Sequence, residues 1–317
     1  MLTKINDLII KNELFTPKDH LLVGISGGPD SVCLVLVLLE LGYKHLSLVH
    51  VNHKLRGESS QRDAKFVQKL GRELKLPVYI SVVDTNAYAK KKKLSIEDAA
   101  RQLRFNCFAK LAIKLRASKL VLAHNANDQV ETVLIKLIRG SGNQGLLGIE
   151  PLRNIDGLTV ARPLLTTWRK EIMGFLKIRK QSCCLDHTNS QPIYLRNKVR
   201  LSILPQLEKL NPNIGQTILR MTDILQEEEK YLRGESQCLA TAVIKEKNSK
   251  GSLLDKKKFY SLPLAMQRRV LRLVIEEVQG HLENVSLLYI DNFLENKLTT
   301  IKLDKRGILH TSKEKLR

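Results

Sequence analysis

The stretch that most constrains this fold is 21–41, LLVGISGGPDSVCLVLVLLEL. It opens with an apolar run that predicts a buried strand, and it then turns through SGGPDS at 26–31. A helix pattern follows, with one apolar face formed by Val32, Val35, Leu36 and Leu39. Glycines let backbone N–H groups approach an anion, and a helix start adds unpaired N–H groups. The stretch therefore predicts a phosphate site, although the turn alone leaves open an ordinary corner capped by Ser26 or Asp30.

This turn matches neither of two common phosphate-binding motifs. It lacks the Gly-Lys-Ser/Thr ending of a Walker A loop, and it lacks the GxGxxG dinucleotide fingerprint. SGGPDS after an apolar strand instead resembles the pyrophosphate loop, SGGxDS, of the PP-loop ATP pyrophosphatases, which cleave ATP between its α and β phosphates. The resemblance implies that ATP is bound by Ser26, Gly27, Gly28, Pro29, Asp30 and Ser31.

The chain is strongly basic, and this charge indicates which kind of partner it binds. Its 317 residues include 53 Lys and Arg against 32 Asp and Glu, a formal net charge of +21. An excess of this size favours a polyanionic partner, most simply a nucleic acid. Only 5% of the residues are aromatic, so stacking of bases on aromatic rings is not expected to be the main binding device.

The cysteines and the apolar runs indicate the compartment. The five cysteines are odd in number and lack a CxxC spacing, which disfavours a disulfide framework and a zinc knuckle. The chain shows no signal-peptide pattern and no apolar run of about 20 residues. We therefore expect a cytoplasmic protein with reduced cysteines.

The periodicity predicts two domains of different class. Up to about residue 165, β-rich runs at 21–25, 46–51, 78–83 and 119–123 alternate with helix patterns. This alternation predicts an α/β fold, a parallel sheet with helices on both faces. Beyond Leu210 the pattern is mainly helical, with helices expected at 214–244, 253–279 and 285–294. We therefore expect an ATP-binding domain at 1–210 and a smaller, mainly helical domain at 211–317.

Polar residues follow the predicted strands and share faces of the predicted helices. His50, His53 and Arg56 lie at the end of the second strand, and His124 and Asp128 follow the fourth. Ligands of open α/β sheets bind at the carboxyl ends of the strands, although a loop without a role is the alternative. Asp128 and Glu131 also have the spacing of a helix-capping box. Arginines that could hold a phosphate or an RNA backbone are Arg101, Arg104, Arg139, Arg196 and Arg200.

Further blocks narrow the resemblance to the tRNA(Ile)-lysidine synthetase family. They stand in family order, as HVNHKLRGESSQRDAKFV, EDAARQLRF, LAHNANDQVETVLIKLIRGSG, RPLLTTWRKEI, DHTNSQPIYLRNKVR and LPLAMQRRVLRLVI. The family uses ATP, Mg²⁺ and free L-lysine to convert the wobble cytidine of an isoleucine tRNA with a CAU anticodon to lysidine. The base is adenylated on its carbonyl oxygen with release of pyrophosphate, and the lysine amine then displaces AMP.

The resemblance implies roles for particular residues. Asp30, Asp128 and Arg101 would be catalytic, with Asp30 and Asp128 as Mg²⁺ ligands. The alternative for Asp128 is to steer the lysine ammonium group or to take its proton. His50 and His124 would join the loop in binding the nucleotide. Contacts to substrate and tRNA would come from His53, Arg56, Arg104, Arg139, Arg196 and Arg200. The basic stretches 256–258 and 267–269 in the second domain are expected to grip tRNA phosphates.

Some positions depart from the family pattern, and two other functions stay open. HNANDQ replaces the usual HHxDDQ, which puts Asn125 and Asn127 in place of a His and an Asp, and Asn52 replaces the Asp of VDH. The expected roles therefore concentrate on His124 and Asp128. A PP-loop enzyme that thiolates tRNA is one alternative, although such enzymes typically use paired cysteines. A non-catalytic RNA-binding protein is the other, and a homodimer is left open.

Overall fold

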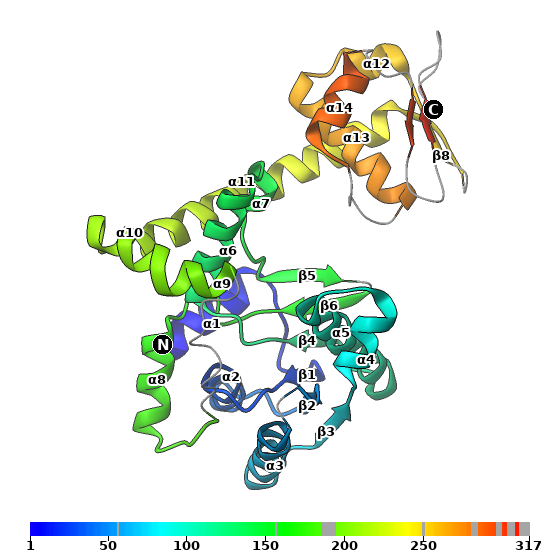
Figure 1. The fold of residues 1–317 in the computed structure, drawn as a ribbon. Helices are drawn as coiled ribbons and strands as arrows, with labels where there is room; N and C mark the ends of the chain where they lie inside the picture. Colours follow the sequence, from blue (N-terminus) through cyan, green and yellow to red (C-terminus); the bar gives the residue numbers. More distant parts are fainter. Residues whose placement is uncertain are drawn as a thin grey trace. The chain divides into compact units, whose positions relative to one another are not determined.

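The computed structural model describes residues 1–55, 57–155, 157–184, 195–248, 251–279, 285–295, 300–302 and 308–310. The chain divides into two compact units, Met1–Asp223 and Ile224–Arg317 (Figure 1). The division falls inside the long helix α11 (Ile214–Val243), C-terminal to the change in composition at residue 210. The reason is packing, because Ile214 and Ile218 at the start of α11 join an apolar cluster of the first unit.

A six-stranded sheet organises the first unit, in the order β3-β2-β1-β4-β6-β5. The expected strands form β1 (Leu21–Gly24), β2 (Leu46–Asn52), β3 (Val78–Val82) and β4 (Lys119–Val121), all parallel. β6 (Leu158–Ala161) adds in parallel to β4, and β5 (Leu152–Ile155) pairs antiparallel with β6. The sequence reasoning missed this last hairpin, whose turn uses a left-handed backbone at Gly157 (φ 81°).

Helices cover both faces of this sheet, as the alternating pattern predicts. Leu21 and Val23 of β1 belong to one buried cluster, whereas Leu22 between them belongs to another. The first cluster includes residues of α1, α2, α3 and α8, and the second includes residues of α5 (Figure 1). The helical elements of the unit are α1 (Leu2–Lys11), α2 (Pro29–Glu40), α3 (Glu58–Glu73), α4 (Thr85–Lys92), α5 (Ile96–Leu115), α6 (Ala126–Arg139), α7 (Asn143–Leu146), α8 (Arg169–Ile178), α9 (Leu195–Lys198), the π-helix η2 (Val199–Ile203) and α10 (Leu204–Leu210).

The second unit is mainly helical, and it also contains short antiparallel strand pairs. Its elements after α11 are β7 (Ile244–Asn248), β8 (Gly251–Leu254), α12 (Lys256–Tyr260), α13 (Leu264–Gln279), α14 (Leu287–Leu294), β9 (Thr300–Lys302) and β10 (Ile308–His310). The expected continuous helix over 253–279 is wrong, because β8 takes its first residues and Pro263 separates α12 from α13. Phe259, Ile290 and Phe293 are fully buried in the core of this unit.

No helix within the described part of the chain is both long enough and apolar enough to cross a membrane.

Candidate active site

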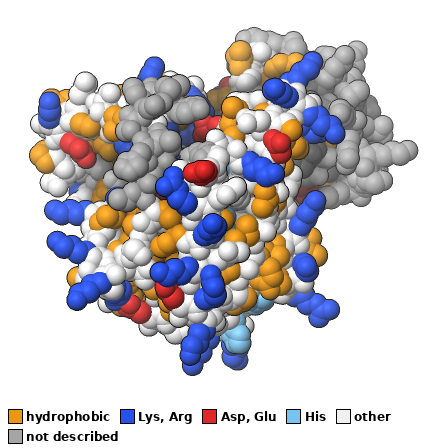
Figure 2. Space-filling model, turned by 60° about the horizontal axis from the view of Figure 1, so that its bottom comes forward, with side chains coloured by type: hydrophobic (Ala, Val, Ile, Leu, Met, Phe, Trp, Pro, Cys, Tyr) orange, Lys and Arg blue, Asp and Glu red, His pale blue; other side chains and the backbone are white. Residues whose placement is uncertain are grey.

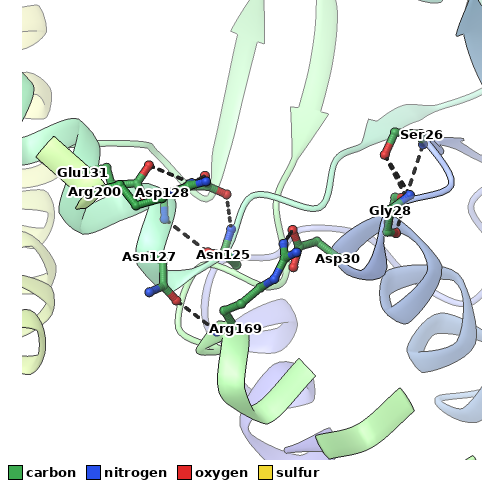
Figure 3. A network of polar contacts seen from close by, with 10 residues as sticks. Ser26, Gly28, Asp30, Asn125, Asn127, Asp128, Glu131, Arg169 and Arg200 are labelled. Carbon is green, nitrogen blue, oxygen red and sulfur yellow. Dashed lines mark hydrogen bonds and ion pairs between the residues drawn. The ribbon is translucent and has the colours of Figure 1, made fainter. Parts of the chain in front are cut away.

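The SGGPDS turn forms a loop between β1 and α2 that its own serines hold in shape. The Gly28 N–H donates to Ser26 Oγ at 3.2 Å (Figure 3). The Ser31 hydroxyl donates to the Gly28 carbonyl at 2.9 Å. Gly27 has φ 91°, and a Cβ there would lie 3.2 Å from Cys184 Sγ, so this position requires glycine. Pro29 is the first residue of α2, where its missing N–H costs nothing.

His50 of β2 supports the start of this loop, and His53 directly follows β2. His50 is 6% exposed, and its Nδ1 donates to the carbonyl of Ile25 at 2.9 Å, which fixes the start of the loop. His53 is half-buried, and its Nδ1 lies 3.0 Å from the Thr85 hydroxyl. Burial lowers the pKa of His53 to about 4, so this imidazole is neutral at pH 7.

The residues after β4 cap helix α6. The Asn125 side-chain oxygen accepts from the Asp128 N–H at 3.1 Å, and Asp128 Oδ2 accepts from the Asn125 N–H at 3.0 Å (Figure 3). The capping box considered for Asp128 with Glu131 is therefore wrong, because Asn125 is the cap and α6 begins at Ala126. Asn125, a departure from the family pattern, suits this position well. Only one oxygen of Asp128 is used by the cap.

Glu131, in the same helix as this cap, is a buried carboxylate that was not among the predicted site residues. The Glu131 side chain is 1% exposed, and it pairs with both Arg196 and Arg200. Arg196 Nε lies 3.1 Å from Glu131 Oε2, and Arg200 Nε lies 2.6 Å from Oε1. Arg200 also lies 3.9 Å from Asp128 Oδ1. The two arginines expected to contact substrate and tRNA thus balance the charge of Glu131 and Asp128.

Asp30 lies at the start of α2 and forms an ion pair of its own, apart from the pairs of Glu131 with Arg196 and Arg200. Its Oδ2 forms an ion pair with Arg169, the first residue of α8 (Figure 3). Its Oδ1 is buried and has no hydrogen-bond partner among the described residues. Burial raises the pKa of Asp30, and the charge of Asp128 adds to this effect, whereas Arg169 opposes it. Two carboxylates are therefore close enough to repel each other.

These carboxylates fit a divalent cation. Carboxylate oxygens are the ligands that Mg²⁺ prefers, and a cation between Asp30 and Asp128 would relieve their repulsion. Asp30 Oδ1, buried without a protein donor, is suited to such a contact. No group of three or more His, Cys, Asp or Glu side chains that could hold a metal ion occurs in the described ranges. A Mg²⁺ ion at this site would complete its shell with water and phosphate oxygens.

Two further side chains with nitrogen atoms, His124 and Arg162, lie at the carboxyl ends of β4 and β6. His124 Nδ1 is buried and has no hydrogen-bond partner in the part of the chain that is described. Burial lowers the pKa of His124 to about 4. Arg162, which directly follows β6, is 5% exposed and donates to the Glu150 carbonyl at 2.8 Å. Burial lowers its pKa to about 10. The sequence reasoning missed Arg162, although an arginine that directly follows a strand was a usable signal.

The remaining predicted arginines that the structure describes lie on exposed positions. Arg101 and Arg104 are exposed on α5, where the Arg101 guanidinium lies 5.7 Å from the centre of the Phe105 ring. Arg139 is exposed at the last residue of α6. Arg56 lies outside the described residues. Figure 2 shows Lys and Arg side chains spread over the visible face, with far fewer Asp and Glu side chains among them.

Two known proteins are similar to this chain over most of its length. The chain is 34% identical over 310 residues to the tRNA(Ile)-lysidine synthase of Caldanaerobacter subterraneus subsp. tengcongensis, covering 96% of this chain and 65% of that protein. It is 35% identical over 302 residues to the tRNA(Ile)-lysidine synthase of Clostridium perfringens, covering 94% of this chain and 63% of that protein. The chain thus spans less than two thirds of the length of these relatives.

A solved structure and a family model complete the comparison. The U34-tRNA thiolase NcsA from Methanococcus maripaludis aligns with a TM-score of 0.57 at 19% identity, covering 71% of this chain and 77% of NcsA. At this identity the likeness concerns the fold alone. Residues 2–207 match the model of the PP-loop domain. This match, with the SGGPDS loop between β1 and α2, shows that the chain belongs to the PP-loop domain family.

Proposed function

We propose that this protein is an ATP-dependent ligase that joins L-lysine to carbon 2 of the wobble cytidine of tRNA(Ile) with a CAU anticodon. The products would be lysidine-containing tRNA, AMP and pyrophosphate. One observation carries the proposal: Asp30 and Asp128 follow the carboxyl ends of the adjacent parallel strands β1 and β4, close enough for the charge of Asp128 to raise the pKa of Asp30. The similarity to tRNA(Ile)-lysidine synthases over more than nine tenths of the chain supports it.

The proposed chemistry needs activation of the base. A cytosine carbonyl oxygen is a poor leaving group, whereas AMP is a good one, so adenylation must precede attack by the lysine amine. In this proposal the loop from Ser26 to Ser31 holds the phosphates, and Asp30 and Asp128 hold Mg²⁺. When bound, Mg²⁺ would neutralise charge that develops on the leaving pyrophosphate. In the alternative to its Mg²⁺ contact, Asp128 would orient the lysine ammonium group or accept its proton.

Neutral histidines are a second feature that suits this chemistry. His53 and His124 have pKa values of about 4, so they add no positive charge at pH 7. Each can therefore accept or donate a hydrogen bond to a polar substrate group without a change in protonation. We assign the contacts with ATP to His50 and His124, and those with substrate or tRNA to His53, Arg104 and Arg139.

We also propose that the second unit grips tRNA phosphates, but through only one of the two basic stretches first expected, 256–258. Arg268 pairs through both nitrogens with Asp291 at 2.7 and 2.9 Å, and Arg269 pairs with Glu229 at 2.9 and 2.6 Å. These arginines therefore support the fold of the unit. Lys257 and Lys258 on α12 are exposed, and they are the better candidates for phosphate contacts.

The test of this function is transfer of labelled lysine. The purified chain should transfer radiolabelled L-lysine to tRNA(Ile) with a CAU anticodon only when ATP and Mg²⁺ are present. A tRNA-thiolating enzyme would leave the lysine free, and a non-catalytic RNA-binding protein would leave ATP intact. We place this reaction in the cytoplasm, where the lysine and the tRNA would meet.

A further inference from the structure

Two ion pairs join α2 and α8 at their opposite ends. Asp30, near the start of α2, pairs with Arg169 at the start of α8. Glu40, the last residue of α2, pairs with Arg179 just after the end of α8. The two helices therefore run parallel. The pairs differ in their surroundings, because only the first one lies at the phosphate loop.

Docking of α8 does not depend on Arg169. Ile172, Phe175 and Leu176 of α8 are buried in the same apolar cluster as α2. The Arg179 guanidinium lies 3.4 Å from the centre of the Phe175 ring, so the far ion pair is anchored as well. Burial of three large apolar side chains outweighs a partly exposed ion pair. The Arg169 side chain is therefore available for a role beyond holding the helix.

The backbone of Arg169 is fixed between the two halves of the candidate site. Its N–H donates to the Asn127 side-chain oxygen at 2.9 Å (Figure 3). The Ala126 N–H donates to the Thr167 carbonyl at 3.0 Å. These contacts tie the start of α8 to the start of α6. Asn127, a departure from the family pattern, thus acts as an anchor for α8. The anchored backbone leaves a side chain that is 45% exposed and reaches Asp30.

The guanidinium and a divalent cation require the same carboxylate. Arg169 occupies Asp30 Oδ2, whereas Oδ1 has no hydrogen-bond partner within the described residues. A cation that binds Asp30 meets the positive charge of Arg169 at close range. Two like charges a few ångströms apart repel each other strongly in a partly buried site. A guanidinium that leaves a carboxylate readily binds phosphate oxygens, because its donors match both groups.

We propose that Arg169 competes with the divalent cation for Asp30, and that it binds pyrophosphate oxygens once the cation has taken the carboxylate. This inference rests on the proposed ATP and cation site. Arg169 would thus disfavour binding of the cation without phosphate and favour binding of the two together. Removal of the side chain should change the two affinities in opposite directions. A residue that only supports the fold would not produce this pattern.

Two equilibrium measurements on the full chain test the proposal. The first is the affinity for Mn²⁺ alone, followed by electron paramagnetic resonance, and the second is the affinity for inorganic pyrophosphate at saturating Mn²⁺, followed by calorimetry. For R169A we expect Mn²⁺ to bind about tenfold more tightly and pyrophosphate about tenfold more weakly. R179A, which breaks the matched pair at the far end of the same helices, should leave both affinities unchanged. R169Q serves in the same measurements if R169A does not fold.

The Mn²⁺ affinity of a D30N variant distinguishes failure of the proposed competition from failure of the cation site on which it rests. We expect D30N to lose most of its Mn²⁺ affinity. If D30N binds Mn²⁺ as the wild type does, the cation site itself is wrong and the inference fails with it. If D30N loses Mn²⁺ but R169A binds it no more tightly than the wild type, or if R169A weakens both ligands, only the competition is wrong.

Discussion

Both carboxylate oxygens of Glu131 accept hydrogen bonds from Arg200, Oε1 from Nε at 2.6 Å and Oε2 from a terminal nitrogen at 3.0 Å. This paired geometry joins α6 to the π-helix η2, and it holds the Arg200 guanidinium near Asp128. Arg196 binds the same glutamate and also donates to the Thr132 hydroxyl at 3.1 Å. Glu131 therefore orders two arginines that the sequence assigned to substrate and tRNA.

Replacement of Glu131 by Gln should destabilise the first unit. The substitution keeps the shape of the side chain but removes the charge that two arginines share. Because the glutamate is buried and the arginines are partly exposed, we expect a loss of about 2 kcal/mol in the free energy of unfolding. Urea denaturation measures this loss. The control is E150Q, which breaks the more exposed pair of Glu150 with Arg153 and should cost less than about 0.5 kcal/mol. Equal stabilities of the two variants would contradict a structural role for Glu131.

Replacement of Asp128 by Asn should separate capping from chemistry. An Asn side-chain oxygen can still accept from the Asn125 N–H, so the stability should change by less than about 1 kcal/mol. The carboxylate charge near Asp30 is lost, so we expect the rate of lysine transfer to fall by at least about 100-fold. Thermal unfolding and single-turnover transfer measure the two effects. A fully active D128N variant would leave Asp128 with a capping role only.

The histidines make stability depend on pH in one window. His53 and His124 have folded-state pKa values of about 4 against an ordinary value of 6.5. Between these values the unfolded chain binds more protons, so stability rises with pH and is lost as the pH falls from 6.5 towards 4. Urea unfolding across this range measures the slope. The H53Q/H124Q double variant should show a shallower slope than the wild type, and an equal slope would rule out neutral histidines as its cause.

Charge reversal on α12 tests the grip on tRNA. K257E/K258E should lower tRNA affinity and reduce the slope of log affinity against log salt by about 0.7 to 0.9 for each phosphate that the lysines no longer neutralise. Thermal stability should stay unchanged, because both side chains are exposed. By contrast, R268E/R269E should destabilise the second unit, since it places like charges against Asp291 and Glu229. Unchanged affinity and salt slope in K257E/K258E would exclude this patch from tRNA binding.

The parts of the fold that sequence reasoning predicted are those that local patterns encode. The strand, turn and helix of 21–41 are adjacent in sequence, and glycine and proline mark the turn directly. The parallel sheet follows from alternating strand and helix patterns. The β5–β6 hairpin was missed because its strands are four residues each and carry little alternation.

The parts of the candidate site that sequence reasoning missed depend on pairing across the chain. Asp30 and Arg169 are far apart in sequence, and no periodicity links them. The same holds for Glu131 with Arg200, and for Arg268 with Asp291. Arg200 and Arg268 had been assigned to phosphate or tRNA contacts, and each pairs with a carboxylate of the chain instead. A single sequence shows the charges but not which of them neutralise one another.

The most direct test follows lysine into tRNA. The purified chain is mixed with radiolabelled L-lysine, ATP, Mg²⁺ and an isoleucine tRNA transcript with a CAU anticodon, and the nucleosides are then separated after nuclease digestion. We predict that label appears in the wobble nucleoside only with ATP, with equimolar release of AMP and pyrophosphate, and that D30A abolishes it while retaining the folded circular dichroism spectrum. Absence of label from the tRNA, with a folded protein and intact ATP, would contradict the proposed function.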